Sequence, residues 1–152
     1  MIAEGEEAPD FELTADSGQP VRLSGLRGKP VVLYFYPKDD TPGCTTQACG
    51  IRDAWDAFER AGAVVLGVSP DDARSHEKFR GKYRLPFTLL ADTDHRVAEE
   101  YGVWGEKKFM GRTYMGVSRS TFVIGEDGTV KKVFAKVKPD THADDVLAVL
   151  SA

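Results

Sequence analysis

The chain has 152 residues, of which 41% are hydrophobic and 29% are charged, a composition typical of a globular domain rather than a disordered or fibrous chain. The 20 basic and 24 acidic side chains leave a formal net charge of −4, which argues against binding to nucleic acid or to an anionic membrane. A chain of this length can build a core without disulfides, so its two cysteines are free for chemistry. We expect one domain over residues 1–152.

The N-terminal segment and the rest of the chain give no sign of export. Residues 1–9 carry three glutamates and no basic segment followed by an apolar run, so no secretory signal is expected. No apolar run is long enough to cross a membrane. The expected location is a reducing cytoplasm, where two cysteines so close in sequence are more often redox-active than structural.

The hydrophobic pattern predicts strands from the N-terminus onward. Short alternating runs at 11–13 and 21–23, on either side of Asp16-Ser17-Gly18, predict a β-hairpin. The continuous apolar runs 31–36 and 64–69 are typical of strands buried on both faces. A further strand is predicted at 87–90, and Asp127-Gly128 between 121–124 and 130–135 predicts an antiparallel pair.

Helices are predicted between these strands. Ile51, Ala54, Trp55 and Phe58 follow the spacing of one helical face and indicate a crossover helix that ends near Gly62. Capping residues predict three more helices, from Asp71 or Asp72 to Tyr83, from Asp94 to Tyr101 and from Thr141 to Leu150. The order predicts an α/β fold, in which helices flank a central mixed β-sheet and a β-hairpin precedes it.

The segment from Pro37 to Cys44 carries the chemistry. It joins a buried strand to the crossover helix, and ligands of open α/β sheets bind at such junctions. Cys44 lies two helical turns before Ile51 on the same face, so its thiol is expected at the helix N-terminus, pointing into the protein. Free N–H groups and the positive end of the helix dipole favour a thiolate there. Thr41 is expected either to cap the helix or to hydrogen-bond a substrate held over Cys44.

The Pro-x-x-x-Thr-x-x-Cys spacing of Pro37, Thr41 and Cys44 resembles the active-site signature of the peroxiredoxins. The stretch from Tyr36 to Thr45 and the later Arg119-Ser120-Thr121-Phe122 are similar to the bacterioferritin comigratory protein, or PrxQ, subgroup of that family. The resemblance covers nearly the whole chain from Gly5 onward. It implies a thioredoxin-like fold and a thiol-dependent peroxidase that needs no metal or other cofactor.

The resemblance also implies a role for each residue of the motif. Cys44 becomes the thiolate that attacks hydrogen peroxide or an organic hydroperoxide, Thr41 orients the peroxide and Arg119 supplies the cation beside both. Pro37 shields the pocket, and the backbone N–H groups of Gly43 and Cys44 can help to hold the peroxide oxygens. Without the resemblance, Arg119 is most simply a surface or salt-bridged arginine.

Cys49 follows Cys44 by five residues, the spacing that places the resolving cysteine of the PrxQ subgroup on the same helix. The resemblance therefore implies a Cys44–Cys49 disulfide, recycled by thioredoxin or a similar dithiol reductant, in a monomeric protein. The alternative for Cys49 is a small packing residue. Gln47 stands where a glutamate is common in relatives, which weakens any role for a carboxylate there.

Other interpretations remain open or are disfavoured. General thiol–disulfide exchange lacks its Cys-x-x-Cys motif, and a copper carrier would need two cysteines and a histidine that converge on one ion. A peroxide sensor would use the same chemistry as the peroxidase. The three histidines are scattered and are expected at the surface rather than at a zinc site, and the lysine pairs 107–108 and 131–132 are expected to be solvated. Trp104 and Tyr114 are expected either to line the pocket mouth or simply to pack.

Overall fold

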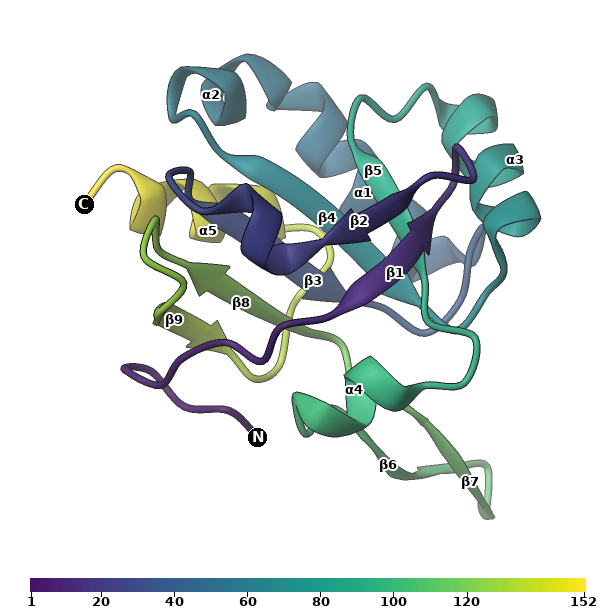
Figure 1. Cartoon of the computed structure of the whole chain (residues 1–152). Helices are drawn as coiled ribbons and strands as arrows, with labels where there is room; N and C mark the ends of the chain where they lie inside the picture. Colours follow the sequence, from purple (N-terminus) through teal and green to yellow (C-terminus); the bar gives the residue numbers. More distant parts are fainter.

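A computed structural model describes residues 1–152, and its core is a seven-stranded sheet in the order β2-β1-β5-β4-β3-β8-β9. Strands β3, β4 and β5 are parallel to their neighbours within this trio, and the other pairs are antiparallel. The strands of this sheet are β1 (Glu12–Ala15), β2 (Pro20–Arg22), β3 (Val31–Phe35), β4 (Val64–Ser69), β5 (Thr88–Ala91), β8 (Ser120–Ile124) and β9 (Val130–Phe134). The mixed α/β architecture predicted from the sequence is confirmed (Figure 1).

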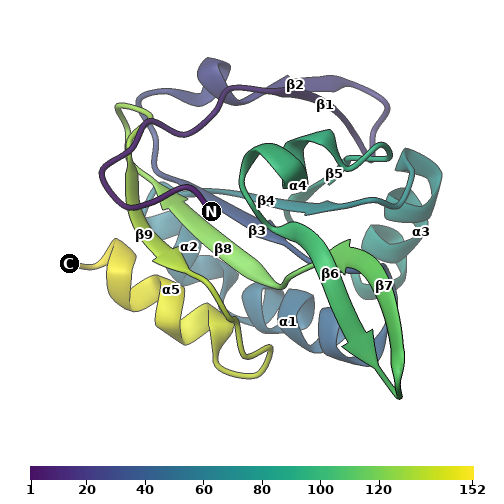
Figure 2. The same ribbon diagram turned by 90° about the horizontal axis from the view of Figure 1, so that it is seen from below.

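Helices cover both faces of the sheet, as Figure 2 shows from below. The helices are α1 (Pro42–Asp53), α2 (Trp55–Arg60), α3 (Ala73–Tyr83), α4 (Arg96–Glu100) and α5 (His142–Leu150), with a 3₁₀ turn at Leu23–Leu26. α1, α2 and α5 lie on one face, and α4 and the N-terminal segment lie on the other. None of the helices combines the length and the apolar composition needed to span a bilayer.

The central strand β3 divides the core in two, because successive side chains of a strand point to opposite faces. Leu33 and Phe35 pack under α4, whereas Val32 and Tyr34 pack under α1 and α5. All of these side chains are at most 1% exposed, so β3 is buried on both faces as its continuous apolar run predicts. Truncation of Leu33 to alanine would cost about 2–5 kcal/mol of stability.

The predicted N-terminal hairpin is present, and it belongs to the main sheet. β1 pairs with β2 on one side and with β5 on the other. The Asp16 carboxylate holds this junction, because it accepts the backbone N–H of Leu89 at 3.1 Å and an N–H of Arg80 at 3.0 Å. The hairpin therefore extends the sheet beyond its parallel centre.

Helix boundaries depart from the predicted ones at two places. The crossover is broken into α1 and α2 at Ala54, whose φ of −102° and ψ of 16° interrupt the helical run. The short helix α4 is capped chiefly by Asp92, whose carboxylate accepts the N–H groups of Val97 and Ala98 at 3.1 and 2.9 Å. The predicted Asp94 accepts only the N–H of Arg96, at 3.3 Å. Thr141 precedes α5 as predicted but does not cap it with its side chain, which donates to Asp145 instead.

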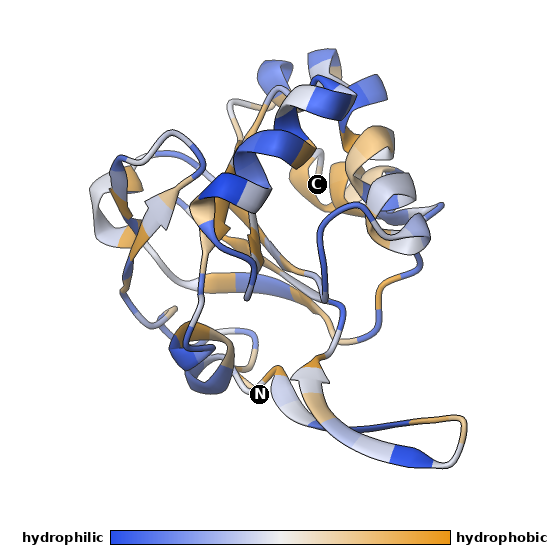
Figure 3. Cartoon of the chain, turned by 90° about the vertical axis from the view of Figure 1, so that its right-hand side faces the viewer, coloured by the Kyte–Doolittle hydropathy of each residue, from blue (hydrophilic) through white to orange (hydrophobic).

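A second, two-stranded sheet was not predicted. It consists of β6 (Trp104–Phe109) and β7 (Arg112–Val117), and it projects from the body of the protein with apolar residues near its outer end (Figure 3). Its turn places Met110 at a φ of +51° and Gly111 at +78°. A left-handed methionine is unusual. Because the turn is Met-Gly rather than Asn-Gly or Asp-Gly, the sequence lacks the signal that usually marks such hairpins.

Candidate active site

Cys44 lies in the first turn of α1, directly beyond the carboxyl end of β3. Thr41 precedes the helix with an extended backbone, and Pro42 occupies the first helical position, where a missing N–H costs nothing. Cys44 is 2% exposed and packs in the same apolar cluster as Ala48 and Ile51. Its thiol therefore points inward at a helix N-terminus, as its spacing from Ile51 predicts.

Arg119 lies beside this thiol. The antiparallel pairing of Phe35 with Ser120 brings the residue before β8 to the end of β3. The guanidinium directs Nη2 to the Cys44 sulfur at 3.4 Å and donates from Nη1 to Gln47 Oε1 at 2.7 Å. A Cβ atom on Gly43 would lie 3.1 Å from the Arg119 Nη2, so a glycine at this position lets the guanidinium approach the sulfur closely.

Thr41 and Pro37 lie on the loop that leads into α1. The Thr41 hydroxyl donates to the backbone carbonyl of Lys38 at 2.8 Å and does not cap the helix. The capping alternative for Thr41 is therefore wrong. Both Thr41 and Pro37 are half-buried, between the strand end and the helix start.

A buried polar network fixes that loop from behind. Asp39 accepts a hydrogen bond from the Tyr36 hydroxyl at 2.5 Å and contacts His76 Nδ1 at 2.7 Å. Its backbone N–H donates to Asp71 at 2.8 Å, and His76 Nε2 contacts the Leu90 carbonyl. The side-chain atoms of Asp39, Asp71 and His76 that could bind a metal ion lie within 4.8 Å of one another, but each makes hydrogen bonds inside this network. The network anchors the loop that carries Thr41.

The prediction of surface histidines is wrong at two positions. His76 is fully buried on the inward side of α3, and His142 is 1% exposed at the start of α5. His142 contacts Gln47 through Nδ1 at 3.1 Å and Thr121 through Nε2 at 2.8 Å. Burial lowers the pKa of His142 to about 4. Each imidazole is buried because residues far away in the sequence supply its partners.

Cys49 lies on α1 with Cys44, and both thiols are free. Cys49 is half-buried, one residue before Gly50. The helix is continuous between the two cysteines, and residues five apart on a regular helix have Cα atoms ~8.6 Å apart. A disulfide requires about 4.4–6.8 Å, so the two sulfurs cannot bond while this part of α1 remains helical.

The projecting hairpin contributes a lysine near the site. Lys107 Nζ donates to the Val117 carbonyl at 2.8 Å, so the prediction of a fully solvated lysine pair is wrong for this residue. Burial lowers the pKa of Lys107, and the charge of Arg119 lowers it further. Trp104 stacks on His95 with ring centroids 3.9 Å apart, which is a packing role, and Tyr114 is exposed on β7.

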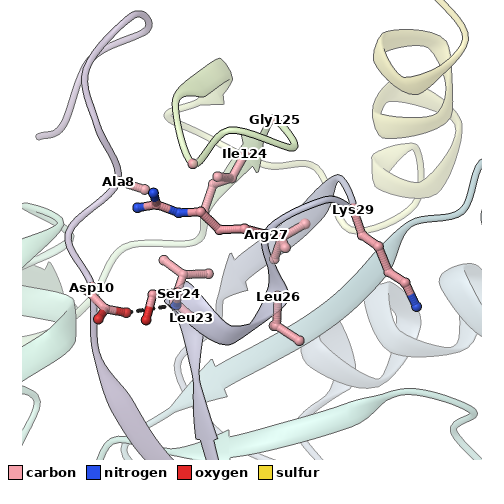
Figure 4. A pocket seen from close by; sticks show the side chains of 11 residues that line it. Ala8, Asp10, Leu23, Ser24, Leu26, Arg27, Lys29, Ile124 and Gly125 are labelled. Carbon is pink, nitrogen blue, oxygen red and sulfur yellow. Dashed lines mark hydrogen bonds between the residues drawn. The ribbon is translucent and has the colours of Figure 1, made fainter.

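The small pocket shown in Figure 4 is not part of this site. Its walls include Lys29 and Val31 at the amino end of β3, whereas Cys44 follows the carboxyl end. The Ser24 N–H donates to Asp10 there at 2.8 Å. The cavity holds only about 10 Å³, roughly the space of one water molecule. We therefore place the candidate active site at Cys44.

Comparison with known proteins identifies the class. Residues 5–133 match the AhpC/TSA family. The chain is 50% identical over 149 residues to the putative peroxiredoxin bcp of Coxiella burnetii, covering 98% of this chain and 99% of that protein. It is also 50% identical over 146 residues to peroxiredoxin Bcp of Bacillus subtilis, covering 96% and 93% of the two chains.

Solved structures agree with the sequence relatives. The crystal structure of peroxidoxin BcpB from Mycobacterium tuberculosis superposes with a TM-score of 0.89 at 40% identity, covering 99% of this chain and 97% of that one. The crystal structure of a cysteine-to-serine mutant of PrxQ from Xylella fastidiosa gives a TM-score of 0.93 at 32% identity, with coverage of 99% and 96%.

The chain therefore belongs to the AhpC/TSA family, as a thiol-dependent peroxidase of the peroxiredoxin class. Within that class its relatives are of the Bcp and PrxQ type, which confirms the resemblance drawn from the motif around Cys44.

Proposed function

We propose that this protein reduces hydrogen peroxide and organic hydroperoxides through a Cys44 sulfenic acid and a Cys44–Cys49 disulfide. The observation that carries the proposal is the Arg119 guanidinium 3.4 Å from a buried cysteine sulfur at the N-terminus of α1. A cation and free helix N–H groups next to one sulfur are the surroundings in which nucleophilic cysteines are found.

In the first step the Cys44 thiolate attacks one oxygen of the peroxide. The S–O bond forms as the O–O bond breaks, the sulfur is oxidised to a sulfenic acid, and the departing oxygen leaves as water or an alcohol after it takes a proton. Arg119 and the backbone N–H groups of Gly43 and Cys44 stabilise the negative charge on that oxygen. Thr41 orients the peroxide, and Pro37 shields the pocket from water.

In the second step the Cys49 thiol attacks the sulfur of the Cys44 sulfenic acid. A disulfide forms and water leaves. A thioredoxin-like dithiol then reduces the disulfide and restores both thiols, while its own thiols are oxidised. We further propose that the protein works as a cytoplasmic monomer; size-exclusion chromatography with light scattering tests its mass.

Coupled turnover tests the proposal. Peroxide consumption is followed through NADPH oxidation with a thioredoxin system, for the wild type, Cys44→Ser and Cys49→Ser. We expect no turnover for Cys44→Ser, and one rapid oxidation without disulfide recycling for Cys49→Ser. Peroxide consumption by Cys44→Ser at the wild-type rate would overturn the assignment. Sustained wild-type turnover with excess reductant separates an enzyme from a peroxide sensor.

A further inference from the structure

Behind the Arg119–Cys44 contact lies a chain of hydrogen bonds that passes through His142 on α5 and ends at Thr121 on β8. It runs from Arg119 Nη1 to Gln47 Oε1 at 2.7 Å, from Gln47 Nε2 to His142 Nδ1 at 3.1 Å, and from His142 Nε2 to Thr121 Oγ1 at 2.8 Å. Gln47 and Thr121 are fully buried, and His142 is 1% exposed. The chain joins α1, α5 and β8 behind the active sulfur.

The direction of every hydrogen bond in this chain follows from Arg119. A guanidinium only donates, so the Gln47 atom that faces Arg119 is the carbonyl oxygen. The Gln47 amide nitrogen therefore faces His142 and donates to Nδ1, which must carry no proton. The remaining proton of the ring lies on Nε2 and is donated to Thr121. Only the neutral imidazole with its proton on Nε2 completes the chain.

We propose that His142 is a positioning residue of the peroxidase: its Nδ1 holds the Gln47 side chain, and through it holds Arg119 against the Cys44 sulfur. The inference rests on the proposed role of Cys44. Burial lowers the pKa of His142, so the imidazole stays neutral and keeps its acceptor for Gln47. Asp145, on the next turn of α5, opposes this effect, and Arg119 reinforces it.

Loss of the acceptor would loosen Arg119 rather than remove it. Without Nδ1, a buried amide N–H of Gln47 has no partner, and an unsatisfied buried donor drives the side chain toward another rotamer. Gln47 would then release the Arg119 Nη1 that it accepts at 2.7 Å. The guanidinium would keep its charge but lose its fixed orientation toward the departing oxygen.

The test measures the second-order rate constant for Cys44 oxidation by hydrogen peroxide, in rapid mixing, without reductant. We expect His142→Leu to react about tenfold more slowly than the wild type, since the free-energy cost of one unsatisfied buried donor corresponds to a rate change of that order. His142→Asn places an amide oxygen near the Nδ1 position and should stay within about threefold of the wild type. An equal rate for the wild type and His142→Leu would overturn the inference.

A double-mutant comparison separates positioning from a merely structural effect. In a Gln47→Met background, His142→Leu should cause no further loss of rate, because His142 acts only through Gln47. A further tenfold loss in that background would overturn the inference. Val146→Ala is the matched control, since Val146 is a fully buried α5 residue that takes no part in these hydrogen bonds. It should lower thermal stability and leave the rate unchanged.

Two further outcomes have defined meanings. If His142→Leu does not fold, His142→Gln replaces it, because its longer side chain places its amide nearer to Thr121 than to Gln47; its rate should also be about tenfold lower. An equal rate for the Asn and Gln variants would then overturn the inference. If the wild-type Cys44 itself is not oxidised by peroxide, the proposed function fails first, and this outcome is distinguishable because Cys44→Ser then behaves as the wild type.

Discussion

Gly50→Ala tests whether α1 must unwind before Cys44 and Cys49 can join. Gly50 lies directly after Cys49 inside α1 and does not adopt a left-handed backbone. No atom of the surrounding structure lies within 4 Å of the position that its Cβ would occupy. Alanine therefore fits without a clash, and relief of crowding against the sheet is excluded as the reason for this glycine.

The expected magnitude follows from helix energetics. Alanine stabilises a helix interior by about 0.8–1.0 kcal/mol relative to glycine. The two cysteines lie ~8.6 Å apart between Cα atoms on a regular helix, so the form that accepts a disulfide has lost helical structure around Gly50. If only that form reacts, the substitution lowers its population, and disulfide formation slows about four- to fivefold.

The assay resolves two phases after mixing with peroxide. Tryptophan fluorescence can report both phases, because Trp55 begins α2 directly after α1. The first phase depends on peroxide concentration and reports attack on Cys44; the second does not and reports disulfide formation, which mass spectrometry of quenched samples confirms. We expect Gly50→Ala to slow the second phase and to leave the first unchanged.

The control uses a glycine on another helix. Gly81 lies within α3, also without a neighbour within 4 Å of its Cβ position and without a left-handed backbone. Gly81→Ala should stabilise the protein by a similar amount and leave both phases unchanged. A second phase equally fast in Gly50→Ala and wild type would refute the reasoning. So would hydrogen exchange that shows residues 44–50 protected in the oxidised protein.

Three further predictions follow from single contacts. Arg119→Met should slow peroxide attack by about 100-fold even at alkaline pH, where the thiol is ionised in both proteins, because the fixed donor to the departing oxygen is lost. If the variant had the same second-order rate constant as the wild type at both neutral and alkaline pH, this prediction would be wrong. Acidification should destabilise the fold through His142, whose pKa falls from 6.5 to about 4 on burial. The unfolded chain takes up a proton below pH 6.5 that the folded chain refuses until about pH 4, so the unfolding free energy drops by about 3 kcal/mol between these values. Urea unfolding at both pH values should show a shallower drop for His142→Asn, and identical drops would contradict the assignment. Asp92→Ala should cost about 1–2 kcal/mol in the same measurement, because it uncaps α4, whereas Asp94→Ala should cost less.

The sequence alone determined the elements whose signals are local. The continuous apolar runs of β3 and β4 identify buried parallel strands, because such strands have no polar face. The spacing from Cys44 to Ile51 places the thiol on the inward face of a helix, because helical geometry repeats within two turns. The motif around Cys44 also sufficed to identify the family.

Contacts between distant residues depend on the tertiary structure. The family resemblance places Arg119 beside Cys44, but the register of β3 with β8 is what brings the two together across 75 positions. Only the structure showed that His142 meets Gln47 across 95 positions, because α5 packs beside α1. The burial of His142 was mispredicted for the same reason. Histidine is found both buried and exposed in proteins, and whether it can be buried depends on hydrogen-bond partners that lie far away in the sequence. The projecting hairpin escaped prediction because its turn uses a left-handed methionine that no local pattern marks. Local periodicity reports contacts within one element, whereas the surroundings of the active sulfur come from contacts between elements, and the register and packing that set them appear only in the folded chain.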